Sequence, residues 1–242
     1  MIEQRPAVEL AIQTVAAAQG YSVQLSAEEH AGRKFYLTFT SAAGNQDRIE
    51  VDVNYLFRIP LVEPETRELW QPGEVAFPEC RTVGHAELWI GKLCALLDRC
   101  APRDLYDAAL SFNPEEERLE DGTFKSLFVA MAGAPNHPLH TYSRKRLERI
   151  TATVVEEQLY PMLTGGDRPA VTDLLDAAWE FLGPLLDLND AEREFIDRFQ
   201  VGELEPQLLF PEQPDMSELL ARHPVLLWKA QNAREHQRRR RS

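Results

Sequence analysis

The hydrophobic pattern of this chain changes from strand-like to helical near residue 84. Before that point, residues 34–40 (KFYLTFT) and 48–55 (RIEVDVNY) alternate polar and apolar side chains, which is typical of strands. Gly44 and Asn45 lie between the two segments and favour a turn, so the pair is expected to form a hairpin. Beyond residue 84 the apolar residues recur at helical spacing. A strand region followed by a long helical region predicts an α+β protein.

Helices are expected on both sides of the hairpin. The leading one covers residues 5–19 and ends at Gly20. After a proline-punctuated connector, whose prolines include Pro72, further helices are expected at 85–99, 102–111, 123–131, 143–160, 170–182 and 189–200, with a last pair broken at Pro224. In the first of these, Leu88 and Leu96 are among the side chains expected to be buried.

Charge is unevenly distributed along the chain. The formal net charge is −13, but residues 234–242 carry five arginines and one glutamate, which leaves about −17 on the rest. An acidic body disfavours unspecific binding to nucleic acid. We expect three parts: a partial α/β core at 1–82, a helical domain at 83–233, and a basic disordered tail at 234–242. A nucleic-acid-binding arm is the alternative interpretation of the 238–241 arginine run.

Composition excludes several classes of protein. No apolar run reaches the roughly 18 residues of a membrane span, and the first residues lack the apolar segment of a secretory signal. Cys80, Cys94 and Cys100 show no CxxC spacing, which argues against a disulfide framework or a cysteine zinc site. The expectation is a soluble, cytoplasmic protein with no membrane partner.

The second expected strand carries acidic residues in its middle. Alternation places Val51 and Val53 on one face, and Glu50 and Asp52 on the other. A mid-strand carboxylate costs desolvation unless it is exposed or paired with a cation. Two interpretations follow: a solvent-facing polar side of the hairpin, or a carboxylate at Asp52 that faces a metal–nucleotide site.

A second cluster of charges lies in the segment IGKLCALLDRCAPRDLYD. Lys92 falls within an apolar helical turn, where a lysine is unusual unless its ammonium meets an anion or reaches water. Arg103, Asp104 and Asp107 open the next expected helix. On a structural interpretation, Asp104 helps to cap that helix and Arg103 pairs with Asp107 at i,i+4 spacing.

The runs GKLCALLDR and RDLYD, with IEVDV about 40 residues before them, resemble the AbiEii/AbiGii toxin family of MenT-like proteins. This family comprises minimal nucleotidyltransferases related to the polymerase-beta superfamily, which act in toxin–antitoxin pairs and phage defence. The resemblance is clearest over residues 31–110. It implies a polymerase-beta-like sheet with a helical C-terminal lobe, Mg²⁺, an NTP substrate, RNA as acceptor (the tRNA 3′ end), and a cognate antitoxin protein.

The resemblance assigns roles only at matching positions. Lys92 matches the family's helix lysine, which is expected to touch the phosphates of the nucleotide. Asp107 matches the last aspartate of the RDxxD motif, expected to act as an acid/base or to orient the lysine. Arg103 and Asp104 match the opening pair of that motif, expected to be structural, with Arg103 also a candidate for nucleotide binding. Asp52 matches a third metal carboxylate.

Three further cations are expected in the first turn of the helix at 143–160. Arg144, Lys145 and Arg146 stand where the helix dipole disfavours positive charge by about 0.3–1 kcal/mol each. One interpretation is a solvated face on which Glu148 compensates their charge. The other, implied by the resemblance, is a contact with the acceptor stem of an RNA.

One feature of the family's sequence pattern is missing. The family grips its nucleotide with a Gly-Ser turn followed by a strand that bears Asp-x-Asp, and this sequence contains neither. We therefore expect a truncated nucleotidyltransferase sheet, with three explanations open: a truncated or misassigned start, a strand supplied by a second polypeptide, or a lost site. Because nucleotidyl transfer needs metal ions held by carboxylates, the chain as written is expected to be inactive or nearly so. The alternative is a degenerate, non-enzymatic relative that acts as a binding or regulatory protein.

Overall fold

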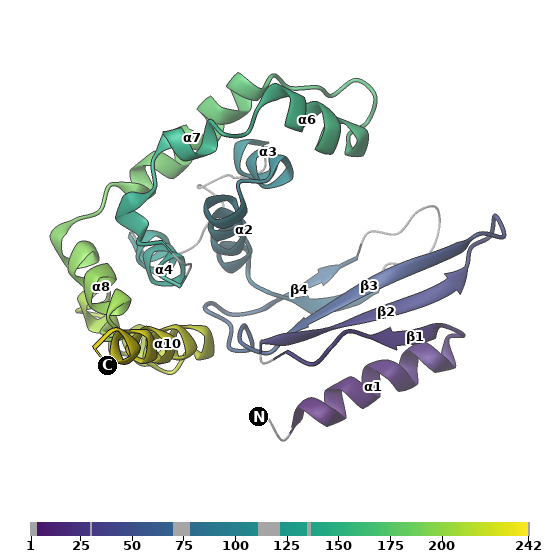
Figure 1. The fold of residues 1–242 in the computed structure, drawn as a ribbon, viewed down its shortest axis with the longest axis horizontal. Helices are drawn as coiled ribbons and strands as arrows, with labels where there is room; N and C mark the ends of the chain where they lie inside the picture. The colour runs from purple at the N-terminus through teal and green to yellow at the C-terminus, as the bar shows by residue number, and fades with distance from the viewer. Residues whose placement is uncertain (1–3, 30, 70–77, 111–121, 135–136, 242) are drawn as a thin grey trace. The chain divides into compact units, whose positions relative to one another are not determined.

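The computed structural model describes residues 4–29, 31–69, 78–110, 122–134 and 137–241 (Figure 1). The chain divides into two compact units, residues 1–58 and residues 59–242. The division falls earlier than the expected boundary at 82, because the connector is bonded to the helices of the second unit. The Leu61 amide donates to Glu87 Oε2 at 2.8 Å, and His223 Nε2 lies 3.0 Å from the Ile59 carbonyl.

Unit 1 consists of a helix and a three-stranded antiparallel sheet in the order β1-β2-β3. Helix α1 (Arg5–Ala18) lies along one face of the sheet formed by β1 (Ser22–Leu25), β2 (Gly32–Thr40) and β3 (Gln46–Asn54) (Figure 1). Its small core contains Ala16, Phe35 and Leu37, with Ile12, Tyr21, Val23, Leu25, Val51 and Val53 packed against it. The structure confirms the expected helix and hairpin and adds β1, which the sequence pattern had not indicated.

Two glycines shape the hairpin. Gly44 has φ of 81° in the turn between β2 and β3, a conformation that glycine adopts without strain. Gly32 pairs with Asn54 at the other end, and a Cβ at Gly32 would lie 2.5 Å from the Val53 carbonyl oxygen. The resulting register places Lys34 directly opposite Asp52.

A buried carboxylate fastens α1 to the sheet. Glu9, only 8% exposed, accepts hydrogen bonds from Arg5 Nε at 2.8 Å, from Arg33 Nη1 at 2.8 Å and from the Tyr55 hydroxyl at 3.1 Å. Burial opposes ionisation of this carboxyl, but the hydrogen bonds from Arg5 and Tyr55 and the charge of Arg33 hold the pKa of Glu9 below its ordinary value. The helix and two strands of unit 1 are thus joined at one charged centre.

Unit 2 opens with a two-stranded sheet and continues as helices. Strands β4 (Glu65–Glu68) and β5 (Glu79–Thr82) pair within the connector that was expected to be irregular, and Pro72 of that connector lies outside the described residues. The α-helices are α2 (His85–Arg99), α3 (Pro102–Leu110), α4 (Thr123–Ala132), α5 (Arg144–Leu147), α6 (Ala152–Gln158), α7 (Val171–Leu186), α8 (Asp190–Gln200), α9 (Pro214–Ala221) and α10 (Pro224–Arg241). Short 3₁₀ turns occur at Leu139–Thr141, Tyr160–Met162 and Pro206–Leu208.

The expected helix at 143–160 is divided into α5 and α6. Thr151 has extended backbone angles and its side chain accepts from the Val154 amide, so it caps the start of α6 and interrupts the first helix. The core of unit 2 lies among α2, α3, α4 and α8, with Leu93, Leu105, Leu127, Phe128 and Phe195 fully buried. Leu96 is buried as expected, whereas Leu88 is 43% exposed, because the inward face of α2 is formed by Trp89, Leu93 and Leu96.

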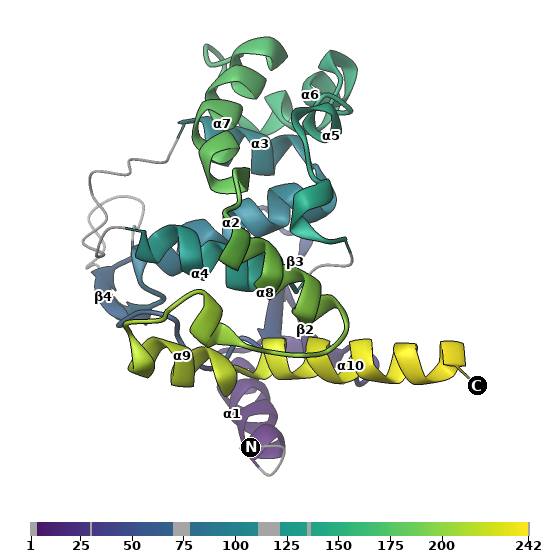
Figure 2. The same ribbon diagram turned by 90° about the vertical axis from the view of Figure 1, so that its left-hand side faces the viewer.

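The C-terminal residues are helical where a disordered tail was expected. Helix α10 continues through Arg241, and its second half extends past the neighbouring helices of unit 2 (Figure 2). Its arginines lie at the helix C-terminus, where the helix dipole favours positive charge. Within the described ranges, no helix combines the length and the apolar character needed to cross a membrane. Cys80, Cys94 and Cys100 are all free thiols.

Candidate functional site

The first candidate site lies in unit 2, between α2 and α3. Lys92 Nζ donates to Asp107 Oδ2 at 2.5 Å, although the two residues are 15 positions apart. Their side chains are 31% and 35% exposed. A solute can therefore reach both groups, while the surrounding protein partly removes them from water and strengthens their electrostatic interaction with any charged ligand.

The connection between the two helices brings this pair together. Helix α2 ends at Cys100, whose φ of 50° reverses the chain, and α3 begins at Pro102. Arg99 donates to both carboxylate oxygens of Asp104, at 2.7 and 3.2 Å. Because Asp104 is only 5% exposed, this two-pronged bond fixes the end of α2 against the start of α3. Asp104 thus joins the two helices through Arg99, a bond that the helix-capping interpretation had not predicted.

Lys92 is supported by two residues on the same face of α2. Its ammonium lies 5.8 Å from the centre of the Trp89 ring, within the range of a cation–π attraction. Trp89 is 3% exposed, and its indole Nε1 donates to His85 Nε2 at 2.9 Å. The i, i+3 and i, i+4 spacings bring these side chains together. The ring therefore helps to hold the ammonium in place beside Asp107.

A loop before α7 contacts α3 next to this pair. The Tyr106 hydroxyl donates to Asp167 Oδ2 at 2.7 Å, and this hydrogen bond raises the pKa of Tyr106. Asp167 follows Gly165 and Gly166, so the glycine-containing loop has a structural contact with the helix that carries Asp107.

The structure pairs the RDxxD residues differently from the i,i+4 interpretation. Asp107 bonds Lys92 and Asp104 bonds Arg99, while Arg103 is exposed in the first turn of α3, one turn before Asp107. The expected bond between Arg103 and Asp107 is therefore replaced by two bonds between helices. Arg103 remains a cation at the surface beside the Lys92–Asp107 pair.

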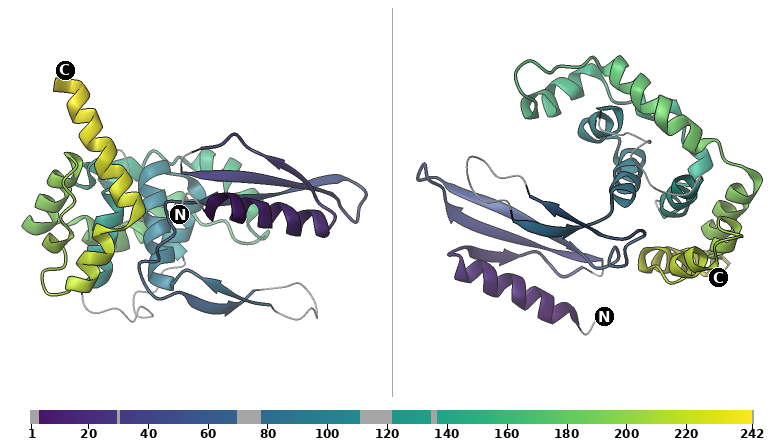
Figure 3. Two further views of the ribbon diagram at one scale, coloured as in Figure 1. Left: turned by 90° about the horizontal axis from the view of Figure 1, so that it is seen from below. Right: turned by 180° about the vertical axis from the view of Figure 1, so that it is seen from behind.

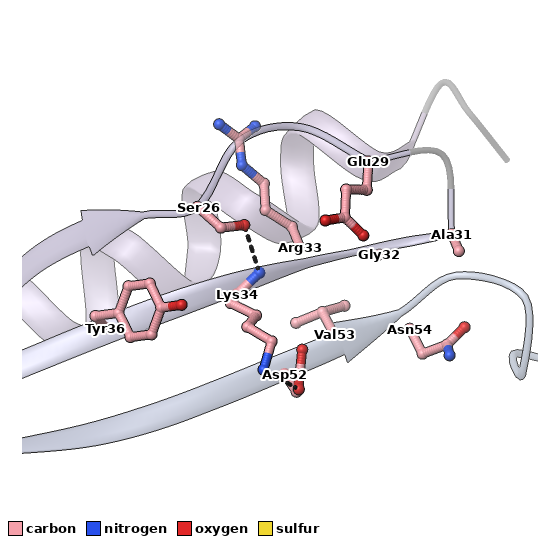
Figure 4. A pocket seen from close by; sticks show the side chains of 10 residues that line it. All are labelled: Ser26, Glu29, Ala31, Gly32, Arg33, Lys34, Tyr36, Asp52, Val53 and Asn54. Carbon is pink, nitrogen blue, oxygen red and sulfur yellow. Dashed lines mark hydrogen bonds and ion pairs between the residues drawn. The ribbon is translucent and has the colours of Figure 1, made fainter. Parts of the chain in front are cut away.

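The second candidate site lies in unit 1, on the polar face of β2 and β3. Lys34 Nζ bonds the Glu50 carboxylate. It also lies 3.1 Å from Asp52 Oδ2, a contact that Figure 4 shows. These two carboxylates raise the pKa of Lys34. Asp52 is 64% exposed, so the strand has the solvent-facing polar side that alternation predicted, with a cation opposite its acids.

A hollow of about 510 Å³ lies beside Lys34 and Asp52, and its wall includes Ser26, Tyr36 and Asn54 (Figure 4). The hollow is formed by residues of unit 1. Its polar side chains offer one ammonium, one guanidinium, two carboxylates, two hydroxyls and one amide to a small polar solute.

The described residues do not fit a Mg²⁺ site of the kind that the resemblance implies. Across the ranges that the structure describes, no group of three or more His, Cys, Asp or Glu side chains could hold a metal ion. Glu50 and Asp52 are alternate residues on one face of β3. However, the Lys34 ammonium already bonds both carboxylates and takes the place that a cation would need.

The three cations expected to meet RNA have different surroundings. Arg144 pairs with Asp176 and, at 3.4 Å, with Glu148. Arg146 donates to the carbonyls of Leu97 and Asp98, and its guanidinium lies over the Tyr142 ring. These carbonyls belong to the last turn of α2, so Arg146 satisfies acceptors that the helix leaves open. Lys145 is exposed.

Sequence reasoning missed the residues that surround the candidate site. Trp89 and His85 could have been found, because they precede Lys92 by three and seven residues and thus share its helix face. The role of Arg99 could not be predicted from spacing alone, because it reaches Asp104 only through the turn at Cys100. The pairing of Lys34 with Asp52 depends on the hairpin register, which the alternation pattern does not fix in detail.

Comparisons with known proteins agree with the sequence motifs. A family model described as nucleotidyl transferase AbiEii toxin, Type IV toxin–antitoxin system, matches residues 2–213. The fold is similar to that of MenT4, a nucleotidyltransferase toxin from Mycobacterium tuberculosis H37Rv, with a TM-score of 0.50 and 19% sequence identity. The alignment covers 83% of this chain and 66% of that one, so the chain spans just under two thirds of the length of MenT4. No curated protein matches the sequence.

Proposed function

We propose that this chain, which belongs to the AbiEii nucleotidyl transferase toxin family, transfers a nucleotide from an NTP to RNA, with the tRNA 3′ end as acceptor. As in a type IV toxin–antitoxin system, its activity would be opposed by a cognate antitoxin. The similarity of fold to MenT4, a nucleotidyltransferase toxin, supports the reaction class by analogy. The choice of RNA as acceptor and the part in phage defence come from the family resemblance.

The observation that carries this proposal is the half-buried ion pair between Lys92 and Asp107. A lysine ammonium is a compact charge that suits a phosphate group, and Trp89 helps to hold it in place. When a triphosphate binds, Lys92 can bond phosphate oxygens while Asp107 keeps the ammonium oriented or accepts a proton. Because nucleotidyl transfer depends on positioning and charge stabilisation, a preorganised cation is the contribution expected of such a residue.

The remaining site residues stay predictions. Arg103, exposed beside the pair, is proposed to add a second cation for the nucleotide. Asp52 is proposed as a metal carboxylate, which requires Lys34 to leave it. Arg144, Lys145 and Arg146 are proposed RNA contacts, of which Lys145 is the most exposed. Members of the family generally use an NTP and a divalent metal ion, so assays should contain Mg²⁺.

Transfer of a labelled nucleotide tests the proposal. The purified chain is incubated with Mg²⁺, each α-labelled NTP in turn and total cellular RNA, and label on the RNA is measured. Because the sequence contains no Asp-x-Asp, we expect only weak label with the unaltered chain, and a further loss of roughly 100- to 1000-fold in both Lys92→Ala and Asp107→Asn, by analogy with the removal of one charge-stabilising group. Arg222→Ala, at an exposed cation 3.8 Å from Glu218, is the matched control and should label RNA normally.

The folded state of each variant is checked by its thermal unfolding. A pair this exposed contributes about 0–1 kcal/mol to stability, so both substitutions should leave the melting temperature nearly unchanged. Undiminished labelling by both folded variants would refute the roles of Lys92 and Asp107.

A second candidate function is a non-enzymatic binding or regulatory protein of the same family. Two observations favour it: the sequence contains no Asp-x-Asp, and the Lys34 ammonium already pairs with both Glu50 and Asp52. It predicts that the unaltered chain labels no RNA with any NTP and gains no thermal stability from Mg–NTP. Labelling that depends on Lys92 would exclude it.

A further inference from the structure

We propose that the second half of α10 is a docking arm for the phosphate backbone of RNA; this rests on the proposed function, in which RNA accepts the nucleotide. The residues that form this arm are 231–241. They lie beyond residue 213, where the match to the family model ends. The arm therefore lies outside the residues that the family match covers.

Charge is the first reason. Residues 234–242 carry five arginines and one glutamate, against about −17 on the rest of the chain. An acidic body repels RNA, so an RNA partner needs a local region of positive potential. Arg234, Arg238, Arg239 and Arg240 are all exposed on one stretch of helix, which concentrates positive charge at one place.

The shape of the arm is the second reason. Two views show α10 continuing past the other helices of unit 2 (Figures 2 and 3). Arg234 and Arg238 are one turn apart, about 6 Å along the axis at 1.5 Å per residue. A projecting helix with cations on successive turns can lie along a nucleic-acid strand and contact several phosphates at once.

The base of the helix is firmly attached, so the arm has a defined direction. Val225, Leu226 and Ala230 are buried in unit 2. Gly202, with φ of 94°, approaches the helix so closely that a Cβ there would lie 2.4 Å from Arg234 Cγ. The backbone that carries the cations is thus already ordered before binding, which lowers the cost of ordering on association.

The amino-acid composition of the arm favours RNA over a membrane or a protein as its partner. Among residues 231–240, only Ala233 is apolar. A helix that lies on a membrane needs a continuous apolar face, and a protein interface needs apolar anchors at its centre. The cations are all arginines, whose planar guanidinium groups bind phosphates with two parallel hydrogen bonds and stack on bases. RNA satisfies these features better than a lipid surface or a protein.

Fluorescence anisotropy tests the arm without any nucleotide transfer. The full chain is titrated against a labelled RNA hairpin with a single-stranded 3′ end, in the absence of NTP, over a series of KCl concentrations. The test variant is Arg238→Gln/Arg239→Gln/Arg240→Gln, because glutamine keeps the helix propensity. The control, Arg67→Gln/Arg81→Gln/Arg222→Gln, removes the same charge at exposed positions elsewhere.

We expect the arm variant to bind the hairpin at least about tenfold more weakly than the control. Its plot of log affinity against log salt should be shallower by about 2–3, since each lost phosphate contact removes about 0.7–0.9 from the slope. Equal binding by the two triple variants, or no binding by the unaltered chain, overturns the proposal. Equally tight, arm-dependent binding to vesicles rich in phosphatidylserine overturns the choice of RNA.

The two proposals fail separately in this design. Arg222→Ala, which lies outside both proposed sites, should bind the hairpin as the unaltered chain does. RNA binding that depends on the arm, without any transfer of label, would refute the enzymatic proposal and support the arm. Transfer of label that the arm substitutions do not reduce would refute the arm and support the enzymatic proposal.

Discussion

Glu9 is the buried carboxylate that holds Arg5, Arg33 and Tyr55 together in unit 1. Replacing it with alanine leaves Arg33, whose side chain is 21% exposed, without its carboxylate, and leaves Arg5, 14% exposed, with Glu28 at 3.5 Å. Breaking a buried ion pair from one side costs about 3–5 kcal/mol, so Glu9→Ala should lower the free energy of unfolding of unit 1 by that amount. Urea unfolding followed by far-UV circular dichroism measures it. Glu28→Ala, at a side chain 68% exposed and 3.5 Å from Arg5, should cost less than about 1 kcal/mol.

The same carboxylate predicts a dependence of stability on pH. The pKa of Glu9 in the folded chain lies below its ordinary value of 4.5. Its stabilising contribution is therefore complete above that value and is lost as the pH falls through the folded pKa. Below pH 4.5 the unaltered chain should lose stability more steeply than Glu9→Gln, which carries no titrating group. If the free energy of unfolding falls equally with pH in the unaltered chain and in Glu9→Gln, Glu9 is not the group that causes the loss of stability in acid.

At the scale of the element, Gly84 decides how α2 begins. A Cβ at this position would lie 2.4 Å from Val62 Cγ2 and 2.9 Å from the Glu63 carbonyl oxygen. Gly84→Ala should therefore destabilise unit 2 by about 1–3 kcal/mol through overpacking. Gly91→Ala is the control within the same helix, since a Cβ there meets nothing within 4 Å. Thermal unfolding of both variants makes the comparison, and a normal melting temperature for Gly84→Ala would contradict the close approach.

The helices and the hairpin could be predicted from the sequence because each shows a long periodic pattern of its own. Strands β1, β4 and β5 could not, since each has four residues and is defined by its pairing rather than by its pattern. The importance of Lys92 and Asp107 was visible in their motifs, but their bond was not. The competing i,i+4 pair within α3 is equally compatible with the sequence, and the turn at Cys100 decides between them.

For the whole molecule, the division into two units predicts two unfolding transitions. All four tryptophans, Trp70, Trp89, Trp179 and Trp228, lie after residue 58. Tryptophan fluorescence therefore reports unit 2, while circular dichroism reports both units. Because unit 1 has a small core, the two signals should give transitions that do not coincide. Glu9→Ala should shift the unfolding transition measured by circular dichroism and leave the transition measured by tryptophan fluorescence unchanged. If the two signals give the same transition in the unaltered chain and in Glu9→Ala, the chain unfolds as a single cooperative unit.

The claim that the Lys92–Asp107 pair receives the phosphates of a nucleotide is tested most directly by calorimetric titration of the chain with Mg–NTP. Charge-assisted hydrogen bonds contribute about 1.5–3 kcal/mol, so Lys92→Ala should weaken binding by roughly 10- to 100-fold, while Arg222→Ala should leave it unchanged. Binding of equal strength in the Lys92→Ala variant, or no binding by the unaltered chain, would contradict the claim.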